Sequence, residues 1–306
     1  MSLEYRKNRM SELAEAWKME KVNDFFVAKK ISEKHLNELK NSVKLVVSKA
    51  LDIKFSDDDE EFMFHVENNK SNRTNITPNG GVVPKREYQL EYNLFIRAWC
   101  ELIRELSKDK PDLIKKFRVT PNLRIKYGEE LEDNVGRELN TALPHSDAWL
   151  EGPWGMNCHV PLLGDTQNNY LHFFKLKDES LFDEKKFLSK SKSYKEMQWV
   201  LKFYENDKII PKKDFINISD YSLVHNTQRN PGCGVRISID TTIFVGDHEV
   251  DSDRDVEYTN HIPDIGSETL IICNKRVTDE IMQKKTTFSH YSTGNAKRIN
   301  MMNFYD

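Results

Sequence analysis

The run from Val235 to Phe244 constrains the fold more than any other stretch of the chain. Its odd-numbered positions are mostly aliphatic, while its first even-numbered positions are Arg236, Ser238 and Asp240. Successive side chains of a strand point to opposite faces, so this run predicts a strand with one packed face and one polar face. The arginine needs an anion, because leaving a buried charge unpaired costs roughly 3–5 kcal/mol. A carboxylate ligand bound through two hydrogen bonds would provide one. A salt bridge to Asp240 or Asp247 is the alternative.

A candidate metal site begins at His145 and Asp147, which lie two positions apart in the segment 144–149. On an extended segment these side chains point to the same side and can converge on one ion. One histidine and one carboxylate leave a small divalent ion short of ligands, and His225 is the candidate for the third. Two histidines and a carboxylate on one face of an octahedral ion are typical of non-heme Fe(II) oxygenases.

The order of these motifs is more informative than any one of them. With 9 histidines and 49 acidic residues in 306 positions, chance gives roughly 1.4 His-x-acid matches. A second match, His65-Val66-Glu67, is interpreted as noise. The less common pattern is the sequence of His-x-Asp, a long gap, a histidine at a strand start, and Arg-x-Ser on the next strand.

With these motifs in this order, the chain resembles the Fe(II)/2-oxoglutarate-dependent dioxygenases. Within them it is most similar to the phytanoyl-CoA-hydroxylase-like group, which includes bacterial enzymes of secondary metabolism. The matching core runs from about Val119 to Val245. The resemblance implies that His145, Asp147 and His225 hold Fe(II). Because the aspartate is present, it also argues against a halogenase of this family, in which that position is left free for halide.

The resemblance also implies 2-oxoglutarate and O2 as co-substrates. Arg236 would bind the far carboxylate of 2-oxoglutarate, and Ser238 would assist. Asn157 belongs to the alternating segment 155–163, in which it shares a face with His159. If that polar face points inward, Asn157 would hydrogen-bond the oxoacid; if it points outward, both residues are surface groups.

Two residues are candidates for the substrate side of the site. Trp149 follows the metal pair closely and would form a pocket wall, or else pack as a core aromatic. Asn169 lies in the segment 166–171, which resembles the family's Thr-x-x-Asn-Gly-x-Leu turn, although Tyr170 replaces the glycine. The Pro-Gly-Ser-His sequence that often follows this turn in the family is absent here.

The resemblance implies an α+β fold with a double-stranded β-helix, or jelly-roll, at its core. We expect residues 1–306 to form a single domain, with a helical N-terminal part at 1–117 packed outside the core. The jelly-roll would span 118–246 and carry a helical insertion at about 178–207. Such an insertion could cover the site as a lid, or simply cover a sheet edge. Residues 247–306 would form a C-terminal extension.

Apolar spacing predicts two long helices before the core. Residues 10–52 are expected to be helical, and residues 84–107 form a second helix with an aromatic stripe that is more typical of a core than of a binding site. The acidic run 57–61 is interpreted as a solvated loop, and 68–83 as a loop rich in Asn, Gly and Pro. The stripe of the first helix comprises Leu36, Leu39, Val43, Val46, Val47, Ala50 and Leu51.

Composition excludes several classes of partner. A formal net charge of −3 and a pI near 6.3 argue against nucleic-acid binding. No apolar run approaches the ~20 residues that a membrane-spanning helix needs, and the N-terminus lacks the apolar segment of a secretion signal. Four scattered cysteines suit a reducing, cytoplasmic location. The sequence leaves the oligomeric state open, a homodimer included.

These observations predict a hydroxylase that acts on a small molecule in a biosynthetic pathway; desaturation or ring formation would use the same residues. The sequence does not identify the substrate. Two alternatives stay open. One is a non-catalytic jelly-roll protein that binds a metal or a small molecule. The other is a cupin-like metalloenzyme that uses no 2-oxoglutarate, in which His159 or His172 would join the metal.

Overall fold

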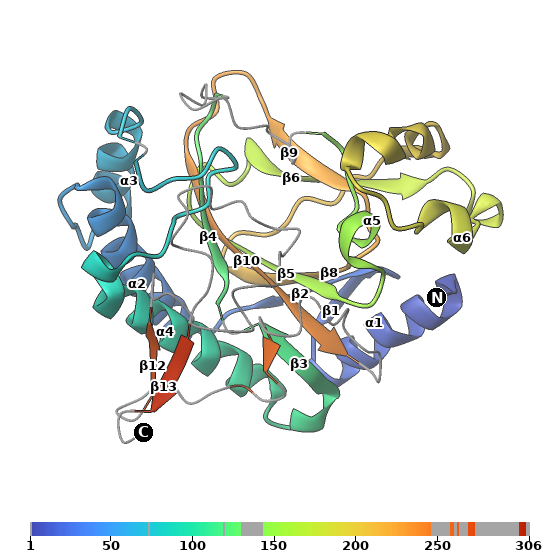
Figure 1. Ribbon diagram of the computed structural model, residues 1–306, viewed down its shortest axis with the longest axis horizontal. Helices are drawn as coiled ribbons and strands as arrows, with labels where there is room; N and C mark the ends of the chain where they lie inside the picture. The colour runs from blue at the N-terminus through green and yellow to red at the C-terminus, as the bar shows by residue number, and fades with distance from the viewer. Residues whose placement is uncertain are drawn as a thin grey trace.

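The computed structural model describes residues 2–72, 74–118, 120–129, 143–245, 258–259, 262, 269–272 and 300–303. Most of the expected C-terminal extension, and Asp247 with it, lies outside the described residues. The described chain combines helices with antiparallel β-sheets (Figure 1). None of its described helices has the length and apolar character needed to cross a membrane.

The N-terminal part is not one continuous helix over residues 10–52, so that prediction is wrong. Helix α1 (Leu3–Trp17) ends where Lys18 adopts a left-handed backbone conformation. A hairpin of β1 (Glu20–Asn23) and β2 (Phe26–Lys30) follows, and α2 (Glu33–Leu51) begins after it. The physical reason is tertiary: β2 pairs along its length with a strand near residue 217, far away in the sequence.

The acidic run 57–61 begins a helix and is not only a solvated loop. The Asp58 side chain accepts a hydrogen bond from the backbone N–H of Glu61 at 2.7 Å and so caps α3 (Asp59–Asn68). Asp59 forms an ion pair with the buried Lys44 at 2.6 Å. The second long helix is found nearly where it is expected, as the 3-10 turn η1 (Arg86–Tyr88) followed by α4 (Gln89–Ser107).

The main sheet has eight antiparallel strands in the order β1-β2-β8-β5-β10-β3-β11, with β4 also pairing with β10. Strand β3 follows the 3-10 turn η2 (Pro111–Leu113). The remaining strands of this sheet are β3 (Ile114–Arg118), β4 (Asn122–Lys126), β5 (Met156–Gly164), β8 (Phe215–Asp220), β10 (Arg236–Val245) and β11 (Tyr258–Thr259).

The alternating run gives this sheet two unlike faces. Ile237 and Ile239 of β10 join Cys158 and Val160 of β5 in the core that also contains the buried side chains of helices α1 to α4. The even-numbered residues of β10 therefore point to the opposite face, away from the helices. Figure 1 shows α2, α3 and α4 together on one side of the main sheet, with β6 and β9 toward the other side.

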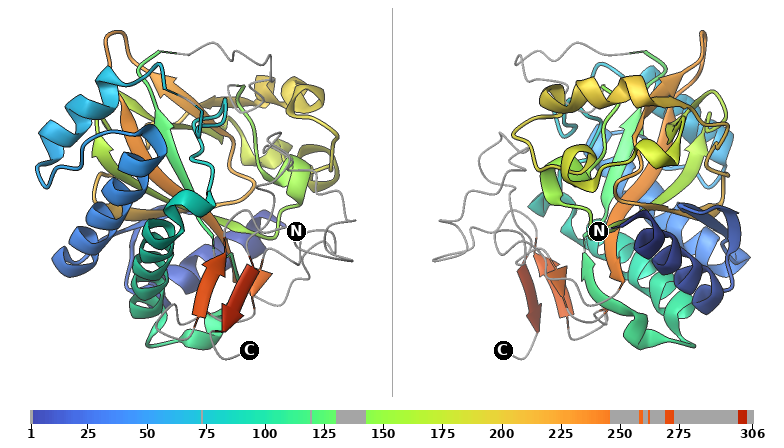
Figure 2. Two further views of the ribbon diagram at one scale, coloured as in Figure 1. Left: turned by 60° about the vertical axis from the view of Figure 1, so that its left-hand side comes forward. Right: turned by 90° about the vertical axis from the view of Figure 1, so that its right-hand side faces the viewer.

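A smaller three-stranded sheet, β7-β6-β9, lies beyond the polar face. Between β6 and β7, within the range 178–207 that was predicted as an insertion, the chain forms η3, α6 and η4. These helical elements are short, and Figure 2 shows this yellow part on the same side of the molecule as α1. The described elements after β4 that lie outside the main sheet are α5 (Ala148–Glu151), β6 (Asn169–Leu176), η3 (Glu179–Leu181), α6 (Glu184–Phe187), the 3-10 stretch η4 (Tyr194–Phe203), β7 (Tyr204–Asn206), β9 (His225–Arg229), and the separate pair β12 (Thr269–Ile272) and β13 (Asn300–Asn303).

Candidate metal centre

Backbone pairing brings the two histidines of the predicted metal site together. The N–H of His145 donates to the carbonyl of His225 at 2.9 Å, and the N–H of His225 donates back at 2.8 Å. This isolated antiparallel bridge places two side chains from distant segments next to each other. With Asp147 they form the one group of potential metal ligands found in the described residues, with ligand atoms all within 4.8 Å of one another.

Each imidazole is oriented by a backbone carbonyl two residues before it. Nδ1 of His145 lies 2.7 Å from the carbonyl oxygen of Leu143, and Nδ1 of His225 lies 3.1 Å from that of Leu223. If Nδ1 carries the proton, each ring donates to its carbonyl and leaves Nε2 free to bind a metal. Second contacts of this kind fix the tautomer and the ring orientation of metal-binding histidines.

The carboxylate of Asp147 has its own supporting contacts. The amide Nδ2 of Asn157 donates to Oδ2 of Asp147, and the hydroxyl of Tyr194 lies 3.4 Å from Oδ1. Nε2 of His225 is 3.8 Å from Oδ2. The contact that the structure gives Asn157 is therefore with a metal ligand, whereas the sequence interpretation had it bind the oxoacid.

The electrostatics of the group favour metal binding near neutral pH. Burial, together with the neighbouring His225, lowers the pKa of His145 to about 4. The ring centroids of the two histidines are 4.5 Å apart. A neutral imidazole is the form that binds metals. Two imidazoles and one carboxylate are the donor set of the non-heme Fe(II) facial triad, so the residues present fit Fe(II).

Arg236 is buried, as its strand position predicted, with only 1% of its surface exposed. Its Nε and Nη1 atoms have no hydrogen-bond partner among the described residues. Burial lowers the pKa of its guanidinium to about 10. The expected alternative partner, Asp240, is bound instead by Arg124 and by Asn122. The guanidinium is therefore held in the interior without a carboxylate from the described chain.

Two further polar side chains on this face are buried without a partner. Ser238 is fully buried and its Oγ has no partner, and both ring nitrogens of His159 are likewise unpaired. Burial first, and then the positive charge of Arg236, lowers the pKa of His159 to about 3; His225 contributes as well. His159 is thus neutral and lies within electrostatic reach of both the arginine and the metal ligands.

Trp149 packs against the helical insertion. It is 1% exposed, and its indole N–H donates to the carbonyl of Phe187 at 2.8 Å. Met197 and Val200 of η4 belong to the same core cluster. Of the two roles expected for Trp149, these contacts describe the packing one.

Asn169, the second candidate for the substrate side of the site, ties strand ends together. It is fully buried, and its Nδ2 donates to the carbonyls of Lys126 at 2.8 Å and of Gly234 at 3.1 Å. These two carbonyls belong to the end of β4 and to the residues just before β10. The amide nitrogen thus joins neighbouring segments, while the buried Oδ1 of Asn169 has no hydrogen-bond partner among the described residues.

The structure adds Tyr194, which the sequence interpretation missed. Its ring centroid lies 4.3 Å from that of His145, and it opens η4 in the insertion. Gln198, one turn later, donates through Nε2 to the carbonyl of Pro144 at 2.9 Å. A single tyrosine in a charged segment carries no spacing signal, so only the fold could reveal that the insertion touches the metal-binding segment.

No family model and no curated protein matches this chain, whereas many solved structures do. One is the non-heme α-ketoglutarate-dependent carbocyclase SnoK from nogalamycin biosynthesis (8% identity, 77% of this chain and 84% of that chain covered, TM-score 0.47). Another is the epimerase SnoN in complex with Fe3+, α-ketoglutarate and nogalamycin RO (11% identity, 78% and 84% covered, TM-score 0.42).

A third is an N-substituted L-amino acid dioxygenase from Burkholderia ambifaria AMMD in complex with α-ketoglutarate (9% identity, 78% and 87% covered, TM-score 0.33). At these identities and TM-scores the likeness has no functional weight by itself, so a function has to rest on the side chains of this chain. The solved structures that the chain resembles include non-heme α-ketoglutarate-dependent enzymes, and the chain carries a His-Asp-His metal-ligating group of its own.

Proposed function

We propose that this protein is an Fe(II)/2-oxoglutarate-dependent oxygenase that hydroxylates a small molecule. The observation that carries the proposal is the pairing of two unusual features. A two-histidine, one-carboxylate group has both imidazoles held at Nδ1 by backbone carbonyls, and a buried arginine with unpaired nitrogens belongs to the polar face of β10. We also propose that the two antiparallel sheets form the halves of a double-stranded β-helix around this interior.

In this proposal His145, Asp147 and His225 hold Fe(II) and leave positions for 2-oxoglutarate and O2. The bound iron, with these co-substrates, supplies the oxidation of a C–H bond to C–OH, while 2-oxoglutarate is converted to succinate and CO2. The chain supplies orientation. The carbonyls of Leu143 and Leu223 hold the two imidazoles, and Asn157 Nδ2 holds the carboxylate.

Arg236 would bind the far carboxylate of 2-oxoglutarate, with Ser238 beside it. A buried guanidinium without a counterion is costly, and a carboxylate that accepts two parallel N–H bonds both offsets this cost and fixes the ligand's orientation. The unpaired Ser238 hydroxyl can donate a further hydrogen bond. Neutral His159 can donate or accept one without adding charge. Three unpaired polar groups on one interior face are what a polar co-substrate needs.

The insertion would cover the substrate side of the site. Tyr194 lies against the His145 ring, and Gln198 is bonded to the carbonyl that precedes it. A small molecule would therefore enter beside η4, and the insertion would contribute to substrate choice. The identity of the substrate does not follow from these contacts.

The two alternatives are less well supported. A cupin-like site would need His159 or His172 at the metal. In the described part of the chain neither belongs to the metal-ligating group, and Nε2 of His172 lies 3.2 Å from the side-chain oxygen of Asn206 in an exposed pair. A non-catalytic binding protein would need only one of the two features, whereas the proposed oxygenase uses both the metal-ligand group and the buried, unpaired Arg236.

The decisive experiment measures succinate. Purified protein is incubated with Fe(II), 2-oxoglutarate and O2, with and without a panel of small molecules, and His225→Ala serves as the control. We expect slow succinate release that one class of compound accelerates, and no release from the variant. Metal-bound protein that fails to bind 2-oxoglutarate under anaerobic conditions would rule out the proposal.

A further inference from the structure

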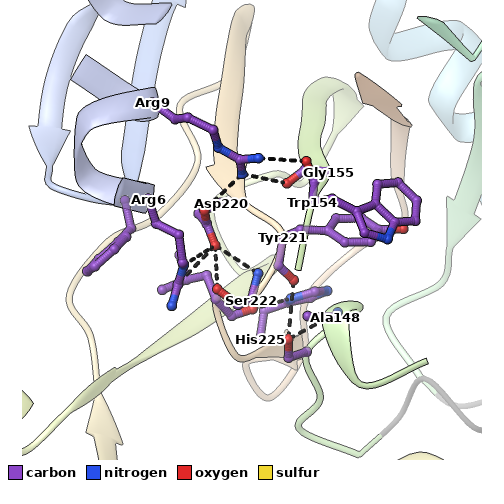
Figure 3. Close-up of polar contacts among 12 residues, drawn as sticks. Arg6, Arg9, Ala148, Trp154, Gly155, Asp220, Tyr221, Ser222 and His225 are labelled. Atoms are coloured by element: carbon purple, nitrogen blue, oxygen red, sulfur yellow. Dashed lines mark hydrogen bonds and ion pairs between the residues drawn. The ribbon is translucent and has the colours of Figure 1, made fainter. Parts of the chain in front are cut away.

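A buried ionic cluster connects the N-terminal helix to the segment that carries His225. Asp220, the last residue of β8, is fully buried. Figure 3 shows two arginine side chains reaching it from α1. Nε and Nη2 of Arg6 lie 3.0 and 2.9 Å from Oδ1 of Asp220. Nη2 of Arg9 lies 3.4 Å from Oδ2.

Both arginines are themselves buried, with exposures of 4% and 3%. Burial alone would raise the pKa of the Asp220 carboxyl, but Arg6 and Arg9 hold it below its ordinary value, so the cluster is charged. Nη1 of Arg9 also donates to the carbonyl of Trp154 at 2.7 Å, just before β5. Arg6 packs over the ring of Phe182 from the insertion. The cluster thus joins α1, β8, β5 and the insertion.

From Asp220 the hydrogen bonds continue directly to the residues that lead to His225. The backbone N–H and the hydroxyl of Ser222 both donate to Oδ1 of Asp220, and the N–H of Leu223 donates to the Asp220 carbonyl at 3.0 Å. These bonds fold residues 220–223 into a tight turn. The carbonyl of Leu223 at the end of this turn is the group that orients the ring of His225.

The same turn also holds the segment 146–148, which contains Asp147. The carbonyl of Tyr221 accepts hydrogen bonds from the Ser146 hydroxyl and from the N–H of Ala148, each at 3.2 Å. These two residues flank Asp147 in the chain. Figure 3 shows Ser222, Tyr221, Ala148 and His225 gathered on one side of the ionic cluster. One turn therefore touches the segments that supply all three ligands.

We infer that Asp220, held by Arg6 and Arg9, is a positioning residue of the metal centre. It fixes the 220–223 turn, and the turn fixes the His225 ring and the backbone on both sides of Asp147. Helix α1 is then part of the metal site's support, although it supplies no ligand. This inference rests on the proposed function insofar as it takes His145, Asp147 and His225 as metal ligands.

The test is metal affinity in the full chain, with Co(II) as a spectroscopic probe of the iron site. Asp220→Asn keeps the shape of the side chain and removes its charge. Loss of an outer partner of a metal ligand typically weakens metal binding by about 10–100-fold. We expect a Co(II) Kd increased by that factor and an altered Co(II) absorption spectrum, because the geometry of the ligands changes.

A matched control separates positioning from general destabilisation. Lys44 is another fully buried charge, bound to Asp59 and to the carbonyl of Asp57 between α2 and α3, outside this network. Lys44→Met should lower the melting temperature of the metal-free protein and leave the Co(II) Kd and spectrum unchanged. If Lys44→Met weakened Co(II) binding as much as Asp220→Asn, the positioning role would be refuted.

A second variant decides the matter if Asp220→Asn does not fold. Arg6→Lys keeps the positive charge but loses the paired Nε and Nη2 contacts, so we expect a smaller loss of Co(II) affinity in the same direction. Wild-type affinity and spectrum in this folded variant would overturn the inference. Wild-type protein that binds neither Co(II) nor Fe(II) would instead overturn the proposed function on which the inference depends.

Discussion

Arg236 and Asp240 are four residues apart on the same face of one strand, yet they do not form an ion pair. The carboxylate of Asp240 forms an ion pair with Arg124 of the neighbouring strand β4. Arg236 keeps two buried nitrogens without a partner. At the scale of single residues, the proposed function depends on such unpaired groups, because each costs free energy until a ligand binds it.

The first prediction concerns Arg236→Met, which replaces the charge by an apolar chain of similar length. We expect 2-oxoglutarate binding to the Co(II)-loaded protein to weaken by about 10–100-fold, because a charge-assisted hydrogen bond contributes roughly 1.5–3 kcal/mol. The metal-free protein should become more stable, because an unpaired buried charge is removed. Calorimetric titration and thermal unfolding measure the two effects. Unchanged 2-oxoglutarate affinity would show that Arg236 does not bind it.

A second residue-scale prediction uses the pKa of His159, lowered by burial to about 3. The unfolded chain binds a proton at this histidine near pH 6.5 and the folded chain does not. The free energy of unfolding should therefore fall as the pH is lowered from about 6.5 toward 3.

His159→Gln should reduce this slope in the metal-free protein, whereas His172→Gln, which changes a histidine whose pair with Asn206 is exposed, should leave it unchanged. Denaturant unfolding at several pH values provides the measurement. Equal slopes in His159→Gln and wild type would mean that His159 titrates normally in the folded state.

At the scale of elements, the insertion packs onto residues 144–149, the segment that contains His145 and Asp147, through several kinds of contact. Trp149 fills its small core, Gln198 binds the carbonyl of Pro144, and Ser191 donates its N–H to the carbonyl of Trp149 at 2.7 Å. An element fixed at so many points behaves as a wall of the site more than as a freely moving loop.

This packing predicts that Trp149→Ala lowers the free energy of unfolding by about 3–5 kcal/mol, the usual cost of emptying a buried aromatic position. Trp199→Ala is the matched control in the same insertion, because Trp199 is 45% exposed; its effect should stay within about 0.5 kcal/mol. Chemical denaturation compares the two. A small loss for Trp149→Ala, together with changed substrate choice, would restore the pocket-wall interpretation.

At the scale of the whole molecule, the metal centre exists only when distant parts of the chain are assembled. His145 and His225 meet through a backbone bridge between separate segments. Helix α1 supports the segment that leads to His225, because Arg6 forms an ion pair with Asp220. The unfolded chain therefore cannot reproduce the site, and metal binding must be linked to global stability.

The corresponding prediction is a melting temperature that rises with Co(II) or Fe(II) concentration. A ligand that binds only the folded state stabilises it by about 2.7 kcal/mol at 100 times its Kd. A chelator should reverse the rise, and His145→Ala should abolish it. Differential scanning calorimetry of both proteins checks this, and an equal rise in His145→Ala would place the metal elsewhere.

Sequence alone was enough for several features that depend on local spacing, but not for the hairpin that divides residues 10–52. The two-residue period of β10 assigned Arg236 to the polar face, and the His-x-Asp spacing put two ligands on one side of the chain. Helical periodicity located α2 and α4. These patterns are readable because the direction of a side chain follows from the local backbone geometry.

Only the tertiary structure decided which groups become partners. It inserted a hairpin after α1 because β2 pairs with β8, and it paired Asp240 with Arg124. It buried Trp149 and Asn169 in contacts with the chain itself. It also set Tyr194 beside the ring of His145 and bound Asp220 to the turn that leads to His225. Contacts of this kind join residues far apart in the chain, and no local period encodes them. Their energy depends on burial and on competing partners, both of which exist only after the chain has folded.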